Sequence, residues 1–187
     1  MKEEHDDAHL IETRVTSEAV FDGALLHVRR DTVRLPDGSH ATREYVVHPG
    51  AVLIVPVLPD GRLVVERQFR YPVGKVFIEF PAGKLDRDEA GLCAAQRELT
   101  EETGYAASTW TPLGRIHSVV GYSSEAIDFF VAEGLVHVGS KPDDGEFLEI
   151  ITSSVDDMLD ALDRGEITDA KTVAALLLYT RRRLRMP

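Results

Sequence analysis

The chain has very little cysteine and tryptophan, with one residue of each among 187. A single cysteine cannot form an internal disulfide, which is typical of proteins in a reducing compartment. No apolar run approaches the length that spans a bilayer, and the start, MKEEHDDAHL, lacks the basic and apolar segments of a secretion signal. We therefore expect a soluble cytoplasmic protein that does not bind membranes.

Basic residues are also scarce, since 21 Lys and Arg stand against 32 Asp and Glu, for a formal net charge of −11 at pH 7. Phosphate backbones are bound through clustered Lys and Arg, so nucleic acid is not an expected partner. The one basic run lies within residues 181–185. We interpret it as a helix C-terminus, where cations are favoured by the helix dipole, with a phosphate-binding tail as the alternative.

The length suits one domain of ordinary size with a real apolar core. Alternating apolar residues and turn signals predict antiparallel strands over residues 11–47, with a PDGS turn at 36–39. Residues 51–57 and 62–69 read as a hairpin whose first strand is almost fully apolar and lies in the core. Further strands are expected over residues 110–119, 125–136 and 147–152, and amphipathic helices over 155–165 and 169–184.

One short segment is unusually acidic, with glutamates at Glu89, Glu98, Glu101 and Glu102. If residues 90–103 form a helix, Glu98 and Glu102 lie on one face, because residues four apart are neighbours on a helix. Uncompensated carboxylates in that arrangement repel one another. A cluster this dense therefore indicates a cation that neutralises it, and oxygen ligands alone favour Mg²⁺, with Mn²⁺ possible. For any two of these glutamates taken alone, a solvated acidic helix face is the alternative.

Two glycines and an arginine frame these glutamates. Gly83 gives the backbone freedom to turn and to aim its carbonyls, while Gly104 supplies a left-handed residue that ends the helix. Arg97 can reach back to Glu89 or Glu101 and orient a carboxylate through a charge-assisted pair. Cys93 stands among small apolar residues and is expected to be a buried helix residue, not a zinc ligand.

Taken together, these residues resemble the signature of a known protein family. Their spacing matches, at every defined position, the signature of the Nudix hydrolases: Gly83, Glu89, Arg97, Glu98, Leu99, Glu101, Glu102 and Gly104. Shorter flanking pieces resemble the branch of that family that contains ADP-ribose and nucleoside-diphosphate-sugar pyrophosphatases: residues 43–52, 68–70, 79–86, 123–125, 144–150 and 165–172.

The resemblance implies an α/β fold, the Nudix α/β/α sandwich with a mixed sheet, preceded by an N-terminal antiparallel β region. It divides the chain into a flexible N-terminus at residues 1–10, the β region at 11–48 and a Nudix hydrolase domain at 49–187. In similar proteins the N-terminal strands are exchanged between subunits, so a homodimer is also implied.

The resemblance also implies roles for individual residues. The metal ligands would be the Ala82 carbonyl, Glu98 and Glu102, with Glu101 oriented beside them by Arg97. Glu89 would lie behind these ligands or bind a further ion. The catalytic base would come from a later loop, at Glu146 or, as the next candidate, Glu149. Substrate-binding positions would be Arg70 for the phosphates, Glu125 for the terminal ribose, and Arg43, Tyr45, His48 and Gly83. For the residues outside the signature, solvated surface charges or sheet packing are the plainer alternatives.

The implied reaction is metal-dependent hydrolysis of the pyrophosphate of ADP-ribose to AMP and ribose 5-phosphate. One departure bears on the substrate, because Val120 stands where ADP-ribose pyrophosphatases commonly have a proline. Other nucleoside-diphosphate sugars, such as GDP-mannose or UDP-glucose, are therefore an open alternative. A nucleotide-sensing module that binds without cleaving is the second alternative, against which all the signature glutamates are present.

Overall fold

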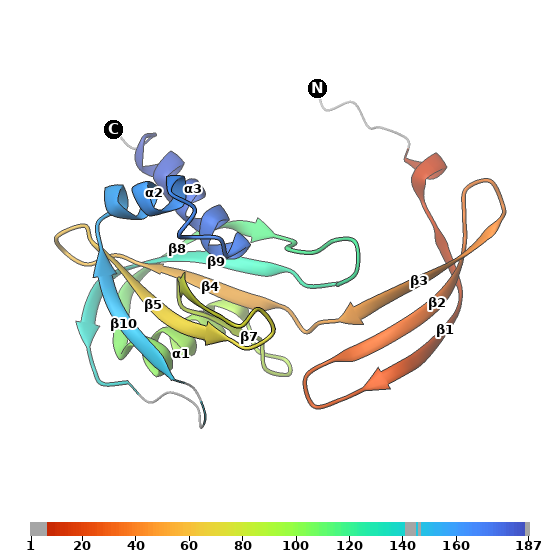
Figure 1. The fold of residues 1–187 in the computed structure, drawn as a ribbon, viewed down its shortest axis with the longest axis horizontal. Coiled ribbons are helices and arrows are strands. Elements are labelled where there is room, and N and C mark those ends of the chain that lie inside the picture. Colours follow the sequence, from red (N-terminus) through yellow and green to blue (C-terminus); the bar gives the residue numbers. More distant parts are fainter. Residues whose placement is uncertain (1–6, 141–144, 146, 186–187) are drawn as a thin grey trace. The chain divides into compact units, whose positions relative to one another are not determined.

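The computed structural model describes residues 7–140, 145 and 147–185. The chain forms two compact units (Figure 1). The first contains the chain up to His48 together with the segment Val119–Glu125, and the second contains Pro49–Ser118 and the chain from Ala126 onward. Among the described residues, no helix has both the length and the apolar character needed to cross a membrane.

The first unit is a small antiparallel sheet, as the alternating sequence predicts. A 3-10 turn, η1 (Ala8–Leu10), precedes the three strands in the order β1 (Thr13–Asp22), β2 (His27–Arg34) and β3 (His40–Val47). The predicted turn joins β2 to β3, because Gly38 takes a φ of 86° and the Asp37 carboxylate accepts a hydrogen bond of 2.9 Å from the Ser39 amide. The segment 119–125 lies beside the end of β3, with a parallel bridge between Val46 and Ser123 and with Val46 N donating to Tyr122 O at 2.9 Å.

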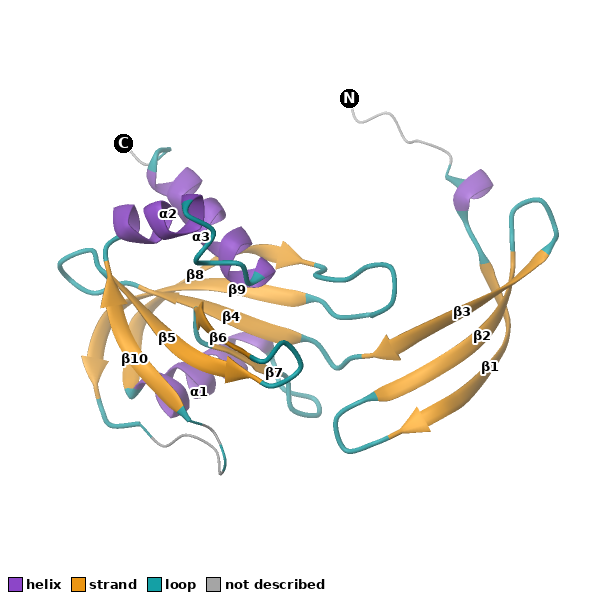
Figure 2. Ribbon diagram, viewed as in Figure 1, coloured by secondary structure: helices purple, strands orange, loops and turns teal. Residues whose placement is uncertain are grey.

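The second unit contains seven strands and three helices among its described residues (Figure 2). In chain order they are β4 (Ala51–Pro56), β5 (Leu63–Arg70), β6 (Lys75–Glu79), β7 (Ala82–Lys84), α1 (Gly91–Thr103), β8 (Tyr105–Ile116), β9 (Ile127–His137), β10 (Leu148–Ser153), α2 (Val155–Asp163) and α3 (Ala170–Arg183). One sheet has the order β7-β4-β9-β8 and the other β10-β5-β6. Among the described strands of this unit, the pairing of β4 with β9 is the only parallel one, so the strands form the expected mixed arrangement.

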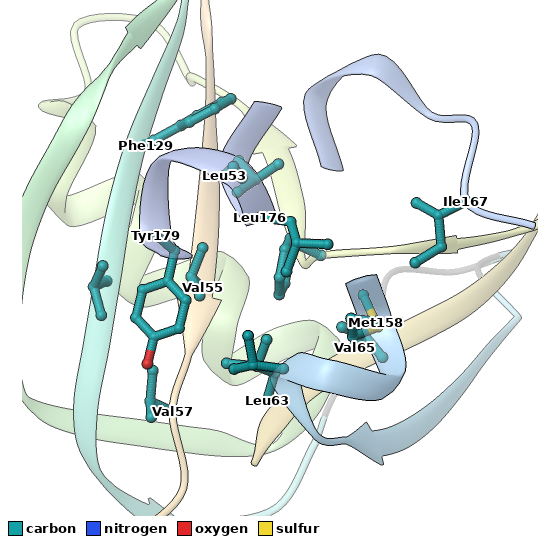
Figure 3. Close-up of a cluster of buried hydrophobic side chains, with 14 of the residues drawn as sticks. Leu53, Val55, Val57, Leu63, Val65, Phe129, Met158, Ile167, Leu176 and Tyr179 are labelled. Atoms are coloured by element: carbon teal, nitrogen blue, oxygen red, sulfur yellow. The ribbon is translucent and has the colours of Figure 1, made fainter. Parts of the chain in front are cut away.

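The sandwich of helices and strands follows from the burial of both faces of β4. Successive side chains of a strand point to opposite faces. Val52 and Ile54 pack in a cluster with residues of α1, while Leu53 and Val55 pack in the larger cluster with α2 and α3 (Figure 3). All four side chains are fully buried. The α/β/α arrangement is therefore confirmed, with α1 on one side of β4 and α2 and α3 on the other.

The predicted hairpin of residues 51–57 and 62–69 is wrong, although its first strand does lie in the core. A single bridge joins Val57 to Leu63, after which the two strands belong to different sheets. The reason is that β4 is already paired on both edges, by β7 and β9, and β5 is paired by β6 and β10. Burial on both faces does not reveal which partners occupy a strand's edges.

The three predicted helices are present. Asp169 caps α3 by accepting a hydrogen bond of 3.0 Å from Thr172 N, and Ser154 caps α2 by accepting one of 3.0 Å from Asp157 N. The basic run falls in the last turn of α3, as expected. The strand expected at residues 110–119 instead begins at Tyr105, directly after α1.

Candidate functional site

The acidic segment folds as a loop followed by a helix whose end is set by a glycine. The predicted helix at residues 90–103 is observed as α1, and Gly104 follows it with a φ of 73°. Its amide donates to Thr100 O at 3.0 Å, and its carbonyl accepts from Val138 N at 2.8 Å. A side chain here would also meet Ser140 N at 2.7 Å. Glycine is therefore required at this position both by conformation and by space.

Two glutamates of α1 meet the backbone of β7. The buried Glu102 accepts a hydrogen bond of 3.1 Å from Ala82 N. The Glu98 carboxylate lies directly against Gly83, where an added Cβ would come within 1.8 Å of Glu98 Oε1. The expected sharp turn at Gly83 is not observed, because this residue pairs with Val52 inside β7 and is not among the positive-φ positions. Glycine is needed there to leave room for Glu98.

Arg97 connects the remaining carboxylates of the segment. Its Nε and Nη2 donate to the two oxygens of Glu89 at 3.1 and 3.0 Å. Its Nη1 donates to Glu98 at 2.8 Å and to Glu101 at 2.9 Å. The hydrogen bonds to Glu89 are the main reason that the pKa of Arg97 is raised, and the same bonds lower the pKa of Glu89. One guanidinium thus holds three carboxylates in fixed orientations, as its sequence position suggested.

The charges in this cluster do not balance. The segment has four glutamates and one arginine, which contacts three of them, and the side chains of Glu89 and Glu98 are only 15% and 13% exposed. Carboxylates removed from water in this way are stabilised by a cation. The described side chains contain no ready-made group of three His, Cys, Asp or Glu around one point. A cation held here would therefore combine Glu98 and Glu102 with backbone oxygen, such as the Ala82 carbonyl.

The available donor atoms suit a hard divalent cation. All the side-chain donors of the cluster are carboxylate oxygens, which Mg²⁺ and Mn²⁺ prefer over nitrogen or sulfur. Cys93 is exposed on α1, so the prediction that it packs inside the helix interface is wrong. Its neighbours Ala94 and Ala95 take the buried positions instead, because the helix turns Cys93 to the outer face. The residues present fit magnesium or manganese.

Of the two candidates for the catalytic base, Glu146 lies outside the described residues. Glu149 is in β10 opposite Arg67 of β5, and its carboxylate accepts a hydrogen bond of 2.5 Å from Arg67 Nη1. The Glu149 side chain is 62% exposed. It is therefore accessible to solvent but already has a cationic partner.

Arg70, the candidate phosphate ligand, is held by a buried carboxylate. Its Nε and Nη2 donate to Oε1 and Oε2 of Glu79, both at 2.8 Å. Lys171 of α3 binds the same carboxylate, and Asp169 contacts Lys171 at 2.9 Å. Sequence reasoning assigned no role to Glu79, Lys171 or Asp169. The polar residues at the start of an otherwise amphipathic helix, in the sequence TDAKT, were the available signal.

The candidate nucleotide-binding residues of the first unit form their own contacts. His48 Nε2 lies 3.5 Å from Glu125 Oε1, so the structure brings these two predicted residues together. Arg43 makes a two-pronged pair with Glu12, and Tyr45 donates to Asp31 Oδ2 at 3.0 Å.

A cavity of about 380 Å³ lies beside these residues, within the first unit. Arg43 and Tyr45 line it from β3, and the segment 120–124 closes another part of its wall. Val120 and Tyr122 are 81% and 61% exposed. The loop that contains Val120 and Tyr122 therefore presents large apolar side chains to solvent.

Comparison with known proteins agrees with the geometry. Residues 47–176 match the NUDIX domain, and residues 12–46 match the nucleoside diphosphate sugar hydrolase N-terminal domain. The chain is 36% identical to an ADP-ribose pyrophosphatase of Bacillus subtilis, over 89% of this chain and 91% of that protein. It is 35% identical to a methanol dehydrogenase activator of Bacillus methanolicus, over 88% and 90% of the two chains. A crystal structure described as an ADP compounds hydrolase superposes with a TM-score of 0.82 at 27% identity, covering 91% of this chain and 92% of the other.

Proposed function

Because this chain belongs to the Nudix family and is a Nudix pyrophosphohydrolase, we propose that it hydrolyses the pyrophosphate of ADP-ribose to AMP and ribose 5-phosphate, with Mg²⁺ as cofactor. Nudix hydrolases generally use divalent metal ions, and two of its relatives are named ADP-ribose pyrophosphatase and ADP-sugar pyrophosphatase. The observation that carries the proposal is the meeting of Glu98 and Glu102 with the backbone at Ala82 and Gly83.

In this proposal Glu98, Glu102 and the Ala82 carbonyl hold the cation. When bound, the metal offsets the charge of the phosphates, lowers the pKa of water and stabilises the leaving oxygen. Arg97 keeps Glu98, Glu101 and Glu89 oriented, so that the carboxylates do not turn away from one another. The close approach of Glu98 to Gly83 restricts the positions open to that carboxylate.

The remaining proposed residues act on the water and the substrate. Glu146 is the proposed base, with Glu149 as the second candidate. Arg70 binds the phosphates, because a guanidinium offers paired N–H groups that match phosphate oxygens. Glu125, Arg43 and His48 bind the nucleoside or terminal ribose, which the 3.5 Å contact between His48 and Glu125 supports. Gly83 contributes through its backbone.

Another nucleoside-diphosphate sugar, such as GDP-mannose or UDP-glucose, is the second candidate substrate. Val120 and Tyr122 favour it, because these exposed residues occupy the loop expected to meet the terminal sugar. A loop without the proline is free to take a different shape around a hexose.

We also propose that the protein is a homodimer, and that it divides into an N-terminal segment at 1–10, of which residues 1–6 lie outside the described residues, the β region at 11–48 and the catalytic domain at 49–187. In the first unit Val33 is the one buried apolar residue among those described, and every residue of β1 is exposed. A three-stranded sheet with so little buried apolar surface needs a further packing partner. A second copy of the chain is the partner we propose.

The test of the function is product release from ADP-ribose, GDP-mannose, UDP-glucose, NADH and diadenosine polyphosphates with Mg²⁺, detected through a coupled phosphatase. We expect ADP-ribose to have the highest kcat/KM. Preference for a hexose-bearing nucleotide would replace ADP-ribose by the second candidate. Turnover no greater than that of a metal-free blank with every compound, together with tight ligand binding, would contradict the proposal.

A further inference from the structure

A cluster of four charged side chains lies in the second unit outside the acidic segment. Glu79, the last residue of β6, is only 1% exposed. Arg70 binds it through two hydrogen bonds of 2.8 Å, and Lys171 binds its Oε2, the oxygen that also accepts from Arg70 Nη2. Asp169 pairs with Lys171 at 2.9 Å and also caps α3. The cluster therefore joins the β5-β6 hairpin to the start of α3.

Stability alone is a weak explanation for this cluster. A buried ion pair loses so much hydration that apolar residues of similar volume often stabilise a protein as well or better. The cluster is also asymmetric, because the Glu79 carboxylate is almost fully buried while 39% of the Arg70 side chain is exposed. Such an arrangement is typical of a charged group that is held from behind while its outer edge meets a ligand.

The hydrogen bonds define which edge of Arg70 faces outward. A guanidinium is planar, and Glu79 takes the edge formed by Nε and Nη2. The edge that carries Nη1 consequently points away from Glu79. A guanidinium anchored in this way loses less conformational freedom when it binds an anion, because its orientation is already set.

We propose that Glu79 is a positioning residue that presents the outer edge of Arg70 to a phosphate group of the substrate, and that Lys171 holds Glu79 in place. The proposal rests on the phosphate-binding role proposed above for Arg70. Lys171 is suited to its part because Asp169 fixes both its ammonium group and the helix turn from which it extends.

The charge state of Glu79 is consistent with this role. Burial raises its pKa, but the hydrogen bonds and charges of Arg70 and Lys171 outweigh burial, so the pKa lies below the ordinary value. Glu79 is therefore ionised at neutral pH. An ionised carboxylate can accept from both cations at once, whereas a neutral one would lose part of the anchor.

The test is a double-mutant cycle on KM for the best substrate. We expect Glu79→Gln and Arg70→Met each to raise KM by about tenfold, the scale of one lost charge-assisted contact, with a smaller change in kcat. In the double variant, Glu79→Gln should add no further increase, because the residue it positions is absent. If Glu79 served stability alone, Glu79→Gln would lower the melting temperature and leave KM unchanged.

Lys171 provides a second variant pair. Lys171→Met should raise KM in the same way, while Lys171→Arg, which keeps the charge, should restore it. Equal factors for Glu79→Gln with and without Arg70 would overturn the proposal, as would a normal KM in folded Lys171→Met. If the wild-type protein shows no turnover, both the proposed function and the proposal for Glu79 are contradicted. If the wild type is active but Arg70→Met leaves KM unchanged, only the proposal for Glu79 and Arg70 is contradicted.

Discussion

Arg97 is the residue on which the orientation of the acidic cluster depends most. It contacts Glu89, Glu98 and Glu101 at once, with donor to acceptor distances of 2.8 to 3.1 Å. A lysine has the same charge but no planar fork, so it could not hold three carboxylates in fixed directions. The cluster nevertheless keeps an excess of negative charge, and this excess makes each carboxylate sensitive to the presence of a cation.

Glu102 is expected to be essential for activity. Glu102→Gln keeps the size of the side chain and removes the charge, and we expect kcat with Mg²⁺ to fall by at least about a hundredfold. Steady-state hydrolysis of the best substrate measures this. Asp163→Asn, which removes an exposed carboxylate at the end of α2, is the matched control and should retain wild-type kcat. Near-normal activity of Glu102→Gln would exclude Glu102 as a metal ligand.

Glu79 is expected to make stability depend on acid pH. Its pKa is below the ordinary value of 4.5 in the folded protein, so between those two values the unfolded chain binds more protons. Its contribution to the free energy of unfolding is therefore fully present above about pH 4.5 and lost as the pH falls through the folded pKa. Thermal melting of wild type and Glu79→Gln from pH 7 to acid measures this. The difference between their melting temperatures should shrink below pH 4.5, and parallel curves would contradict it.

At the scale of elements, the contact between α1 and β7 is the geometric basis of the candidate site. The helix brings Glu98 and Glu102 to one face, and β7 offers a strand without a side chain at Gly83. Both sides are anchored independently, since β7 pairs with β4 and α1 buries Ala94, Ala95 and Leu99. The position of the carboxylates is thus set by packing and not by the loop between the two elements.

Gly83→Ala is expected to damage the site through this contact. The added Cβ would lie 1.8 Å from Glu98 Oε1, so the carboxylate must move. We expect kcat/KM to fall by about tenfold or more, because displaced ligands and their supports commonly cost that much. Gly91→Ala is the matched control, since its Cβ would come no nearer than 3.4 Å to a neighbouring atom. Equal activity of the two variants would show that Glu98 is not held against Gly83.

At the scale of the whole molecule, the second unit contains nearly all the buried apolar residues described, and the first contains one. The first unit instead exposes large apolar side chains, among them Val15 at 51% and Phe21 at 57%. Such surface favours association, because burying it removes apolar area from water.

We expect light scattering to give twice the chain mass of 20.7 kDa. Phe21→Asp should shift the protein toward the monomer, because a charge would have to be buried in the interface. Thr16→Asp, at another exposed position of β1, tests whether any charge on this strand has the same effect. A monomeric wild type at all concentrations would contradict the proposed dimer.

The sequence by itself determined the local features of this protein. The spacing of Glu98 and Glu102 on a helix, the left-handed conformation of Gly104, the turn at Gly38 and the reach of Arg97 to Glu89 all depend on neighbours within a few turns of chain. The α/β/α arrangement and the type of site followed from the match of that spacing to a known family.

Only the tertiary structure decided the contacts between distant segments. It separated β4 from β5, turned Cys93 outward, gave Gly83 its role of making room for Glu98, and assembled Arg70, Glu79 and Lys171. The physical reason is that periodicity reports which face of an element is buried, whereas the partners at a strand's edge and around a buried charge come from chain segments far apart in sequence. Their meeting is determined by the packing of the whole unit.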